Sequence, residues 1–214
     1  MSLRILTNEK LVDFLIKEGY LKTPLIIKAF KKIDRADFVP DNLKELSYEN
    51  TPLPIGFGQT ISQPLTVAFM LELLQPKKGE KILDIGFGSG YLSALLAYCL
   101  GKEGKVYAVE IIKELYDFGR QNLAKYNFLK SKRVETFLTN GYYGLEEIAR
   151  EIKGFDGIIA GASAEEISPF WKEQIKEGGR IVAPVRSSIL FLKKEKGRFL
   201  EKEFFGFSFV PLVK

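Results

Sequence analysis

Three glycines alternate with other residues between Asp84 and Tyr91, in the order Asp-Ile-Gly-Phe-Gly-Ser-Gly-Tyr. Because glycine has no Cβ, such a turn bends tightly and lets the backbone approach a bound molecule closely. The turn follows the apolar run Lys81–Ile85, which predicts a strand, and open α/β sheets bind ligands at the carboxyl ends of their strands. The residues that we expect at the ligand are Asp84, Gly86, Phe87, Gly88, Gly90 and Tyr91.

The spacing of the glycines and the charge beside them favour S-adenosylmethionine over a dinucleotide. Gly90 follows Gly88 by two residues, which is not the spacing of the dinucleotide fingerprint. Asp84 would repel a pyrophosphate, whereas it would attract the ammonium and sulfonium groups of S-adenosylmethionine. A glycine turn alone is also found in nicotinamide and flavin proteins, so these two details decide which cofactor we expect.

Two further strand ends bring polar groups to the same edge of the predicted sheet. Glu110 ends the predicted strand Lys105–Glu110, where a carboxylate accepts hydrogen bonds from both ribose hydroxyls of a nucleoside. Asn140-Gly141 follows the predicted strand Val134–Leu138 and offers a side-chain amide and a backbone N–H to an adenine edge. A solvated acid and a plain turn are the alternative interpretations. The residues expected at the nucleoside are Glu110, Ile111, Asn140 and Gly141.

Alternating strands and helices position these groups. Before the turn we expect helices from Asn8 to Gly19, from Pro24 (with Thr23 as its N-cap) through Ile33, and from Pro64 to Leu74. After it, helices are expected through Leu100, through Tyr126 and over Pro169–Lys176. Strands are expected at 81–85, 105–110, 134–138, 155–160 and 179–185, with an antiparallel pair at 189–194 and 204–211. This order predicts an α/β fold with a doubly wound, mostly parallel, Rossmann-like sheet.

The segment from Tyr48 to Pro64 is rich in Pro and Gly and has no hydrophobic period, so we expect an ordered loop. Loops of this length without secondary structure are usually functional. With 214 residues, the chain is expected to form one domain, 1–214. In it, residues 1–64 would supply the N-terminal helices and a loop that covers substrate and cofactor, and residues 65–214 would form the α/β cofactor-binding core.

The composition excludes several classes of site. The chain has no histidine and one cysteine, so the usual zinc ligand sets and every His-based catalytic triad are unavailable, and no metal is expected. Cys99 lies in an apolar helical stretch and is expected to be buried and inert. The net charge of +5 is scattered among acidic residues, and we therefore expect no nucleic-acid partner.

The hydropathy pattern predicts no association with a membrane. No apolar run reaches the length of a membrane span, and charged residues interrupt the segment Met1–Tyr20, which is therefore not expected to be a signal peptide. Together with the single cysteine, this favours a cytoplasmic location.

Several segments resemble protein-L-isoaspartate O-methyltransferases, and the resemblance covers nearly the whole chain. The segment 53–64, Leu-Pro-Ile-Gly-Phe-Gly-Gln-Thr-Ile-Ser-Gln-Pro, is similar to the most distinctive segment of that family. Asp34–Pro40 resembles its N-terminal signature, and 155–156, 177–185 and 209–212 are similar to its later blocks. The resemblance implies the class I S-adenosylmethionine methyltransferase sheet with an N-terminal helical segment.

The resemblance also implies an activity, methyl transfer from S-adenosylmethionine to the carboxylate of L-isoaspartyl residues in peptides and damaged proteins. The methyl ester then cyclises to a succinimide that reopens partly to normal aspartate, which repairs the protein. In the family, the residue that matches Ser62 is assigned to catalysis. The resemblance places Gln59, Thr60 and Ile61 at the cofactor, and Thr60, Ser62, Leu65 and Val210 at the substrate.

This chemistry agrees with a chain that has no histidine. A carboxylate nucleophile is already ionised at neutral pH, so its attack on the methyl group needs no general base. Ser62 would then orient the carboxylate by hydrogen bonding. Ser62 also precedes the helix that opens at Gln63-Pro64, and serine is favoured as a helix N-cap, so a capping role is expected as well.

Three positions depart from the family pattern and leave two alternatives open. Leu65 stands where the family usually has His or Tyr, and Asn50 and Asn140 stand where it usually has Asp. One alternative is a methyltransferase that acts on tRNA or a small metabolite, against which the segment Gln59–Pro64 argues. The other is a cofactor-binding relative without activity, which Leu65 and Asn140 suggest.

Overall fold

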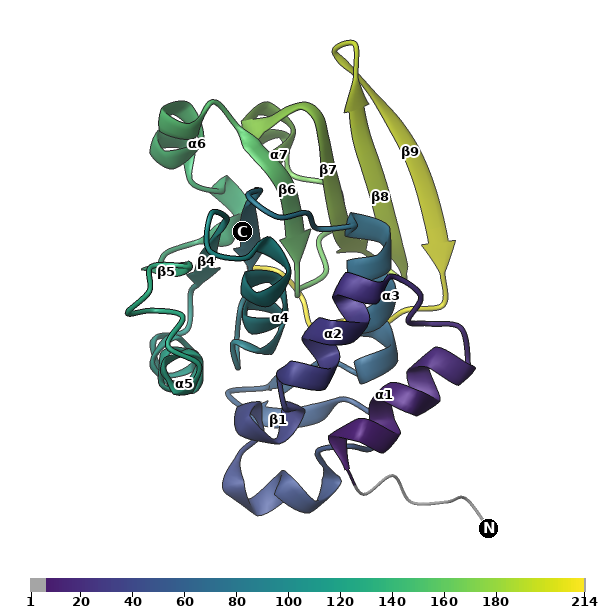
Figure 1. Ribbon diagram of the computed structural model, residues 1–214. Coiled ribbons are helices and arrows are strands. Elements are labelled where there is room, and N and C mark those ends of the chain that lie inside the picture. The colour runs from purple at the N-terminus through teal and green to yellow at the C-terminus, as the bar shows by residue number, and fades with distance from the viewer. Residues whose placement is uncertain (1–6, 214) are drawn as a thin grey trace.

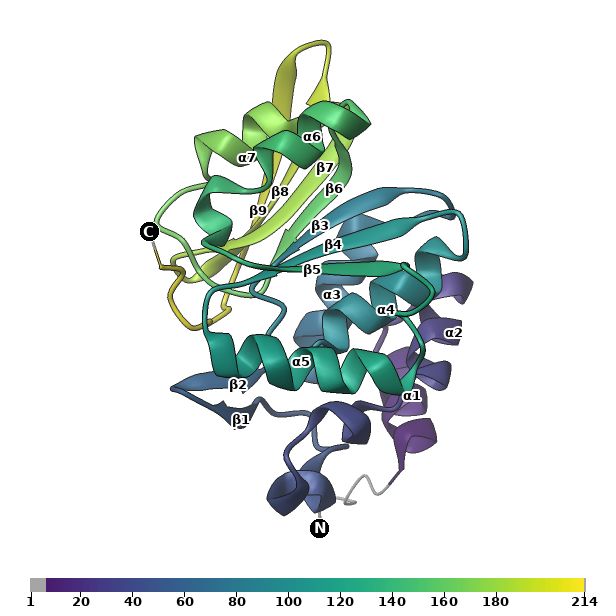
Figure 2. The same cartoon turned by 90° about the vertical axis from the view of Figure 1, so that its left-hand side faces the viewer.

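The computed structural model describes residues 7–213 and contains a seven-stranded sheet with helices on both faces (Figures 1 and 2). The strand order is β5-β4-β3-β6-β7-β8-β9; β3 to β7 pair in parallel, and β8 and β9 run antiparallel to their neighbours. The predicted α/β fold with an antiparallel C-terminal pair is therefore confirmed. The strands are β3 (Lys81–Ile85), β4 (Lys105–Glu110), β5 (Val134–Leu138), β6 (Phe155–Ala160), β7 (Ile175–Val185), β8 (Ser188–Glu195) and β9 (Arg198–Phe205).

The helices form one layer on each face of the sheet, and Figure 2 shows the two layers on either side of the strands. On one face lie α3 (Pro64–Leu74), α4 (Tyr91–Leu100) and α5 (Lys113–Lys125), and on the other lie α6 (Glu146–Ile152) and α7 (Pro169–Gln174). Helices α1 (Asn8–Lys17) and α2 (Pro24–Lys32) pack outside α3 and α4. Short 3-10 helices are η1 (Arg35–Phe38), η2 (Asp41–Leu46) and η3 (Gly141–Tyr143).

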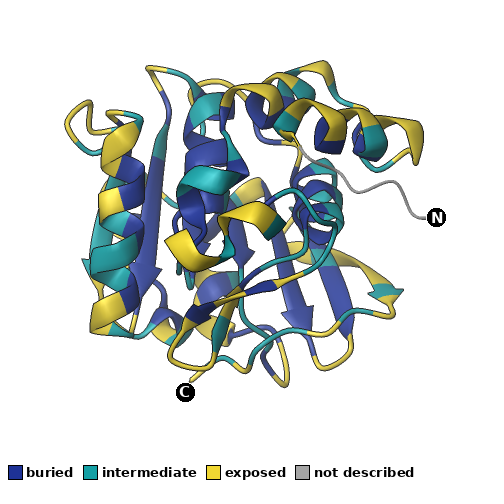
Figure 3. Cartoon of the chain, turned by 90° about the horizontal axis from the view of Figure 1, so that it is seen from below, coloured by how far each residue is buried: buried dark blue, intermediate teal, exposed yellow. Residues whose placement is uncertain are grey.

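The central strands are buried on both faces, which explains why they read as unbroken apolar runs. Alternation along β3 sends Ile82 toward the layer of α3, α4 and α5, and Leu83 and Ile85 toward α6 and α7. Leu11 and Phe30 of the N-terminal helices belong to the same apolar cluster as Ile82. Figure 3 shows buried residues along the central strands and exposed residues on the outer helix faces.

The boundaries of four strands, 81–85, 105–110, 134–138 and 155–160, are those predicted. The prediction for the last strand is wrong, because β9 covers Arg198–Phe205 and not 204–211. Lys196 and Gly197 both have positive φ, 52° and 75°, and close a two-residue hairpin between β8 and β9. The strand therefore begins directly after Gly197, and its Phe-rich end is reached before residue 207.

Three other expectations differ from the structure. Helix α7 ends at Gln174, and β7 begins at Ile175, four residues earlier than the expected Gly179. Helix α6 (Glu146–Ile152) was not expected. The expected loop 48–64 contains a β-hairpin, β1 (Leu53–Gly56) and β2 (Gln59–Ile61), which turns at Phe57 and Gly58 with φ of 53° and 71°.

Cys99 is buried in α4, as expected, and burial raises the pKa of its thiol to about 12, so the thiol stays protonated at neutral pH. Thr23 occupies the N-cap position of α2, but its hydroxyl donates to Glu72 and caps nothing. Across residues 7–213, no helix is both long enough and apolar enough to cross a bilayer. Residues 1–6, which form part of the N-terminus that we expect not to be a signal peptide, lie outside the described range.

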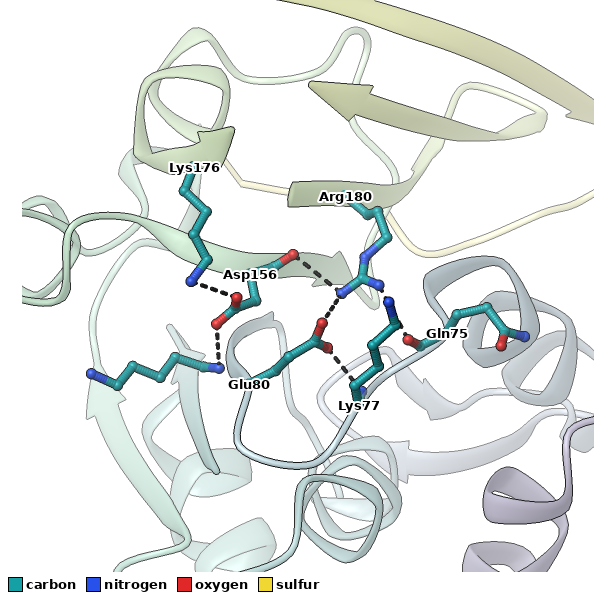
Figure 4. Close-up of polar contacts among 7 residues, drawn as sticks. Gln75, Lys77, Glu80, Asp156, Lys176 and Arg180 are labelled. Atoms are coloured by element: carbon teal, nitrogen blue, oxygen red, sulfur yellow. Dashed lines mark hydrogen bonds and ion pairs between the residues drawn. The ribbon is translucent and has the colours of Figure 1, made fainter. Parts of the chain in front are cut away.

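At the amino ends of the parallel strands, charged side chains form a paired network (Figure 4). Arg180, buried to 8% exposure, donates from Nη2 to Glu80 Oε1 at 2.5 Å and from Nη1 to the carbonyl oxygen of Gln75 at 3.2 Å. Asp156 pairs with Lys176, with 2.5 Å between Nζ and Oδ1. The buried Arg180 and the partly exposed Lys176 therefore each have a carboxylate partner.

Candidate active site

The glycine turn between β3 and α4 needs glycine at all three positions. Gly86, Gly88 and Gly90 have φ values of 74°, 47° and 86°, which lie in the left-handed region. A Cβ on Gly90 would lie 3.0 Å from the carbonyl oxygen of Gly119, and one on Gly88 would lie 3.2 Å from Ile55 Cδ1. The turn is therefore enclosed by α5 on one side and by the β1–β2 hairpin on the other.

Helix α5 lies directly against the turn, a feature that the sequence analysis missed. A Cβ on Gly119 would overlap the carbonyl oxygen of Gly88, so glycine is required where the helix touches the turn. Asn122 Nδ2 donates to the carbonyl oxygen of Ser89 at 3.0 Å. The only indication in the sequence was a glycine inside a helical pattern, which often marks a close approach.

Glu110 joins the end of β4 to the glycine turn. Its carboxylate is 6% exposed and accepts hydrogen bonds from the N–H groups of Gly88 at 3.0 Å, Ile111 at 2.8 Å and Ile112 at 3.0 Å. A carboxylate offers about four lone-pair sites, so these three bonds leave capacity for a hydroxyl. Glu110 thus both holds the turn in place and presents an acceptor beside it.

Asn140 and Gly141 follow β5 at the same edge. Asn140 Oδ1 accepts a hydrogen bond from the N–H of Tyr142 at 2.9 Å and so caps η3, which leaves the Nδ2 donor for other partners. A Cβ on Gly141 would lie 2.5 Å from Ile85 Cγ2, so glycine lets the turn pack directly on β3. Trp171 Nε1 fixes the turn by donating to the carbonyl oxygen of Gly141 at 2.9 Å.

These elements surround a first pocket with about 600 Å³ of space, part of which is open to solvent. Apolar side chains form most of its wall, and Glu110 is the charged residue in it. The first pocket is lined by Ile55, Gln59, Thr60, Ile85, Gly86, Gly88, Val109, Glu110, Ile111, Ile112, Leu115, Asn140, Gly141, Gly161, Ala162, Val210, Pro211, Leu212 and Val213.

A second pocket of about 480 Å³ adjoins the first, and the two share Thr60, Gly86, Gly88 and Gly161 as common walls. The residues that line only the second pocket are Ile61, Ser62, Val67, Met70, Phe87, Ser89, Tyr91 and Leu92. The glycine turn therefore separates a pocket that contains Glu110 from a pocket that contains Ser62.

The hydroxyl of Ser62 makes no hydrogen bond within residues 7–213, and the side chain is half-buried at the wall of the second pocket. The N-cap of α3 is Gln63, and Asn50 Oδ1 accepts the N–H of Leu65 at 3.0 Å. The expected capping role of Ser62 is therefore wrong, because a side chain from the preceding loop occupies that place. This leaves the Ser62 hydroxyl free for another partner.

Asp84 lies beneath the turn and lines neither pocket. It is completely buried; its Oδ2 accepts a hydrogen bond from Ser93 Oγ, and its Oδ1 has no partner among the described residues. Burial raises the pKa of this carboxyl to about 7, against the smaller lowering effect of the Ser93 hydrogen bond. Because Asp84 lines neither pocket, its position does not support the direct contact with a ligand that we expected.

Of two further expected site residues, Tyr91 lines a pocket and Leu65 does not. Tyr91 lines the second pocket, is buried between Phe30 and Phe38, and has a hydroxyl without a partner among the described residues. Leu65 is half-buried, packs on the apolar cluster of the N-terminal helices and lines neither pocket. The structure thus brings every expected site residue to the two pockets except Asp84, Leu65 and Gly90, whose Cβ position faces Gly119 and Leu123 of α5.

The segment after β9 returns to the site and forms part of the first pocket. Ser163 N–H donates to the carbonyl oxygen of Val210 at 2.7 Å, and Leu212 N–H donates to that of Ser163 at 2.7 Å. These bonds hold Val210 to Val213 at the pocket wall. Val210 and Pro211, the last residues of the expected strand 204–211, therefore lie outside β9 and line the first pocket.

The chain is similar to known proteins along nearly its whole length. The family model described as Protein-L-isoaspartate(D-aspartate) O-methyltransferase matches residues 6–214. A relative from Methanopyrus kandleri named protein-L-isoaspartate O-methyltransferase is 38% identical, over 96% of this chain and 91% of its own. One from Ignicoccus hospitalis with the same name is 36% identical, over 97% of each chain.

A solved structure has the same fold over almost the full length. It is a Plasmodium falciparum protein described as a beta-aspartate methyltransferase in complex with S-adenosyl-L-homocysteine, with a TM-score of 0.87 and 26% identity over 98% of this chain and 99% of that one. The family model and the relatives cover the hairpin, the glycine turn and the C-terminal segment together. The chain therefore belongs to the protein-L-isoaspartate O-methyltransferase family.

Proposed function

We propose that this chain transfers the methyl group of S-adenosylmethionine to the side-chain carboxylate of L-isoaspartyl residues in peptides and damaged proteins. The observation that carries the proposal is the pair of adjoining pockets on either side of the glycine turn, one with Glu110 and the other with the free hydroxyl of Ser62. The names of the full-length relatives and of the matching family support the same activity.

In this proposal, the first pocket holds the nucleoside of the cofactor. Glu110 would accept from the ribose hydroxyls, and Asn140 and Gly141 would meet the adenine edge. Because Asn140 Oδ1 is bonded to Tyr142, its Nδ2 donor would face a ring nitrogen of the base. Gln59, Thr60 and Ile111 would close the pocket from the side of the hairpin and of α5.

The second pocket would receive the isoaspartyl carboxylate. Ser62 would donate its hydroxyl proton in a hydrogen bond to one carboxylate oxygen and so aim the other at the methyl group. Bound S-adenosylmethionine supplies an electrophilic methyl group on a sulfonium. The carboxylate is ionised at neutral pH, so none of the residues at the turn has to accept a proton.

Thr60 and Val210 would hold the peptide on either side of the carboxylate, since one belongs to the hairpin and the other to the C-terminal segment. We further propose that the chain works as one domain, in which the hairpin covers both pockets. The cofactor core is not separate, because the N-terminal helices share its apolar cluster. The protonated, single cysteine supports a cytoplasmic location.

The two alternatives receive less support. Full-length relatives with the isoaspartyl activity in their names disfavour tRNA or a small metabolite as substrate. Leu65 and Asn140 suggested an inactive relative, but Leu65 lies outside both pockets, and Asn140 lines the first pocket with its Nδ2 donor available.

The test is to incubate the protein with methyl-labelled cofactor and with two peptides that differ only in an isoaspartyl or an aspartyl linkage. Base-labile methyl ester is then counted. We expect label on the isoaspartyl peptide alone. Equal label on both peptides, or label only on an added tRNA, would overturn the proposal.

A further inference from the structure

Arg35 is a cation without a counterion in the interior of the described chain. Its side chain is 0% exposed, and no carboxylate of residues 7–213 forms an ion pair with it. Desolvation lowers the pKa of its guanidinium to about 10, so the group is still charged at neutral pH. Because arginine is almost never fully buried without a paired charge, its place needs another explanation.

The guanidinium is bound only by backbone carbonyl oxygens. Nη1 donates to that of Ser47 at 2.6 Å, and Nη2 donates to those of Thr51 at 3.1 Å and Ser62 at 3.2 Å. Thr51 precedes β1 and Ser62 follows β2, so one nitrogen bridges both ends of the β1–β2 hairpin. Arg35 therefore fixes the base of the segment that carries Ser62.

The element that carries Arg35 is tied to the same helix that supports the glycine turn. Tyr126, directly after α5, accepts the N–H of Asp34 at 2.9 Å and donates its hydroxyl to Asp37 Oδ2 at 2.6 Å. Lys125 Nζ donates to the carbonyl oxygen of Asp37 at 2.6 Å. Helix α5 also contacts the glycine turn through Gly119 and Asn122. The same helix therefore holds both the glycine turn and the segment that carries Arg35.

We infer that Arg35 is a positioning residue for methyl transfer, which sets where the Ser62 backbone lies relative to the glycine turn. This inference rests on the proposed function. A planar guanidinium with several donors can hold two carbonyl oxygens in one geometry, whereas a lysine ammonium is a point charge on a flexible stem. A displacement of about 1 Å in a reacting group can cost a factor of about 10² in rate.

The test compares Arg35→Lys with Arg180→Lys, a matched control at the opposite end of the sheet (Figure 4). Arg180 is also buried, donates to two backbone carbonyl oxygens, and has an Nε without a partner, as Arg35 does. Steady-state kcat is measured with both substrates saturating, at a temperature where circular dichroism shows each variant folded. Cofactor Kd is measured by calorimetry.

We expect Arg35→Lys to lower kcat by about 10- to 100-fold while cofactor Kd changes by less than about threefold, since Arg35 lines neither pocket. We expect Arg180→Lys to leave kcat within about twofold. If both variants lose kcat by the same factor, or if Arg35→Lys retains the parent kcat, Arg35 is only structural and the inference is wrong.

A second variant covers the case in which Arg35→Lys does not fold. Tyr126→Phe keeps the stacked ring and removes the hydroxyl that ties Asp34 and Asp37 to α5, and should lower kcat about threefold with cofactor Kd unchanged. An unchanged kcat in that variant would contradict the inference.

A third measurement needs no enzymatic activity and so separates this inference from the proposed function. If the parent protein methylates no isoaspartyl peptide, the function is wrong, but hydrogen exchange still tests Arg35. Either folded variant should exchange the amides of β1 and β2 at least about tenfold faster than the parent, and those of β3 at the parent rate. Unchanged exchange in the hairpin would overturn the positioning role.

Discussion

Among residues 7–213, charged side chains are paired at one end of the parallel sheet, and two buried ones are unpaired at the other. At the amino ends, Arg180 lies against Glu80, and Asp156 lies against Lys176 (Figure 4). On the side of the pockets, Asp84 and Arg35 are both buried, and neither forms an ion pair within residues 7–213. The attraction between paired charges offsets part of the free energy that burying them costs. A buried charge without a partner lowers the stability of the fold, so it is expected where a function requires it.

The comparison indicates that the charged residues at the two ends of the strands differ in their roles. Those at the amino ends link the strands, and those at the carboxyl ends form or support the site. At the amino ends, Arg180 and Glu80 form one ion pair and Lys176 and Asp156 form another, so the opposite charges lie side by side. The carboxyl ends carry groups that are incompletely satisfied, which is typical of sites that bind or orient a second molecule. Substitutions at the amino ends should therefore change stability alone, and those at the carboxyl ends should change the pH dependence of stability, cofactor binding or turnover.

The largest expected effect is on the pH dependence of stability. The folded pKa of Asp84, about 7, lies above its ordinary value, so the stability associated with this group is complete below about pH 4 and is lost as pH rises through 7. Asp84→Asn cannot ionise and escapes this loss. Its free energy of unfolding relative to the parent should rise by about 4 kcal/mol between pH 4 and pH 8, measured by urea denaturation.

The control for this prediction is Asp156→Asn at the amino end. It leaves Lys176 without its partner and should lower the free energy of unfolding at pH 7 by up to about 1 kcal/mol. A relative stability of Asp84→Asn that does not change with pH would show that Asp84 is not desolvated as described, and the contrast between the two ends would fail.

The next effect is on cofactor binding. Gly88→Val puts a side chain against Ile55 at a left-handed position and should weaken S-adenosylmethionine binding by at least about 100-fold in calorimetry. Gly79→Val is the matched control, because Gly79 also has positive φ, 81°, but a Cβ there meets nothing within 4 Å. Its strain should cost about 1–2 kcal/mol of stability and leave Kd within about threefold. If the two variants lose cofactor affinity by a similar factor, the loss in Gly88→Val does not show that Gly88 lies at the cofactor.

Turnover should respond to charge at Ser62. Ser62→Asp is expected to be folded and to bind cofactor, but to methylate an isoaspartyl peptide about 50-fold more slowly, because the new carboxylate at the wall of the second pocket repels the substrate carboxylate. The measurement is kcat/KM for the peptide at saturating cofactor. A variant that works at close to the parent rate would mean that Ser62 has no role in the reaction.

The smallest effect distinguishes capping from catalysis within one short segment. Asn50→Ala removes the acceptor of the Leu65 N–H at the start of α3 and should cost about 1 kcal/mol in free energy of unfolding. Ser62→Ala should cost less than about 0.5 kcal/mol, since its hydroxyl has no partner in residues 7–213, yet it should lower turnover. If thermal denaturation reverses this order of stabilities, Ser62 is the cap after all.

Most of the fold could be predicted from local pattern. The strands 81–85, 105–110, 134–138 and 155–160 are short, mostly apolar segments between turns, and their predicted limits agree with the structure. Strands 81–85, 105–110 and 155–160 are buried in the centre of the sheet, and the edge strand 134–138 is partly buried. β9 could not be predicted in the same way. Its outward residues are charged, and the apolar segment after it has a competing role at the pocket wall.

The site was predictable where backbone geometry imposes the residue type and less so where tertiary contacts decide. The glycines of the turn are required by their positive φ, which a sequence reveals. The burial of Asp84, the free hydroxyl of Ser62 and the cation at Arg35 depend on partners 9 to 27 positions away, for which a local pattern gives no indication. Asn50 takes the capping role from Ser62 for the same reason.

The segment Val210–Val213 has a consequence for the order in which the protein is made. Synthesis on the ribosome is directional, and N-terminal parts of a chain can begin to fold first. The glycine turn, Glu110 and Ser62 all emerge long before residue 210, but the first pocket lacks one wall until Val210 bonds to Ser163. A nascent chain can therefore complete the parallel strands β3 to β7, which end at Val185, before it can enclose a cofactor.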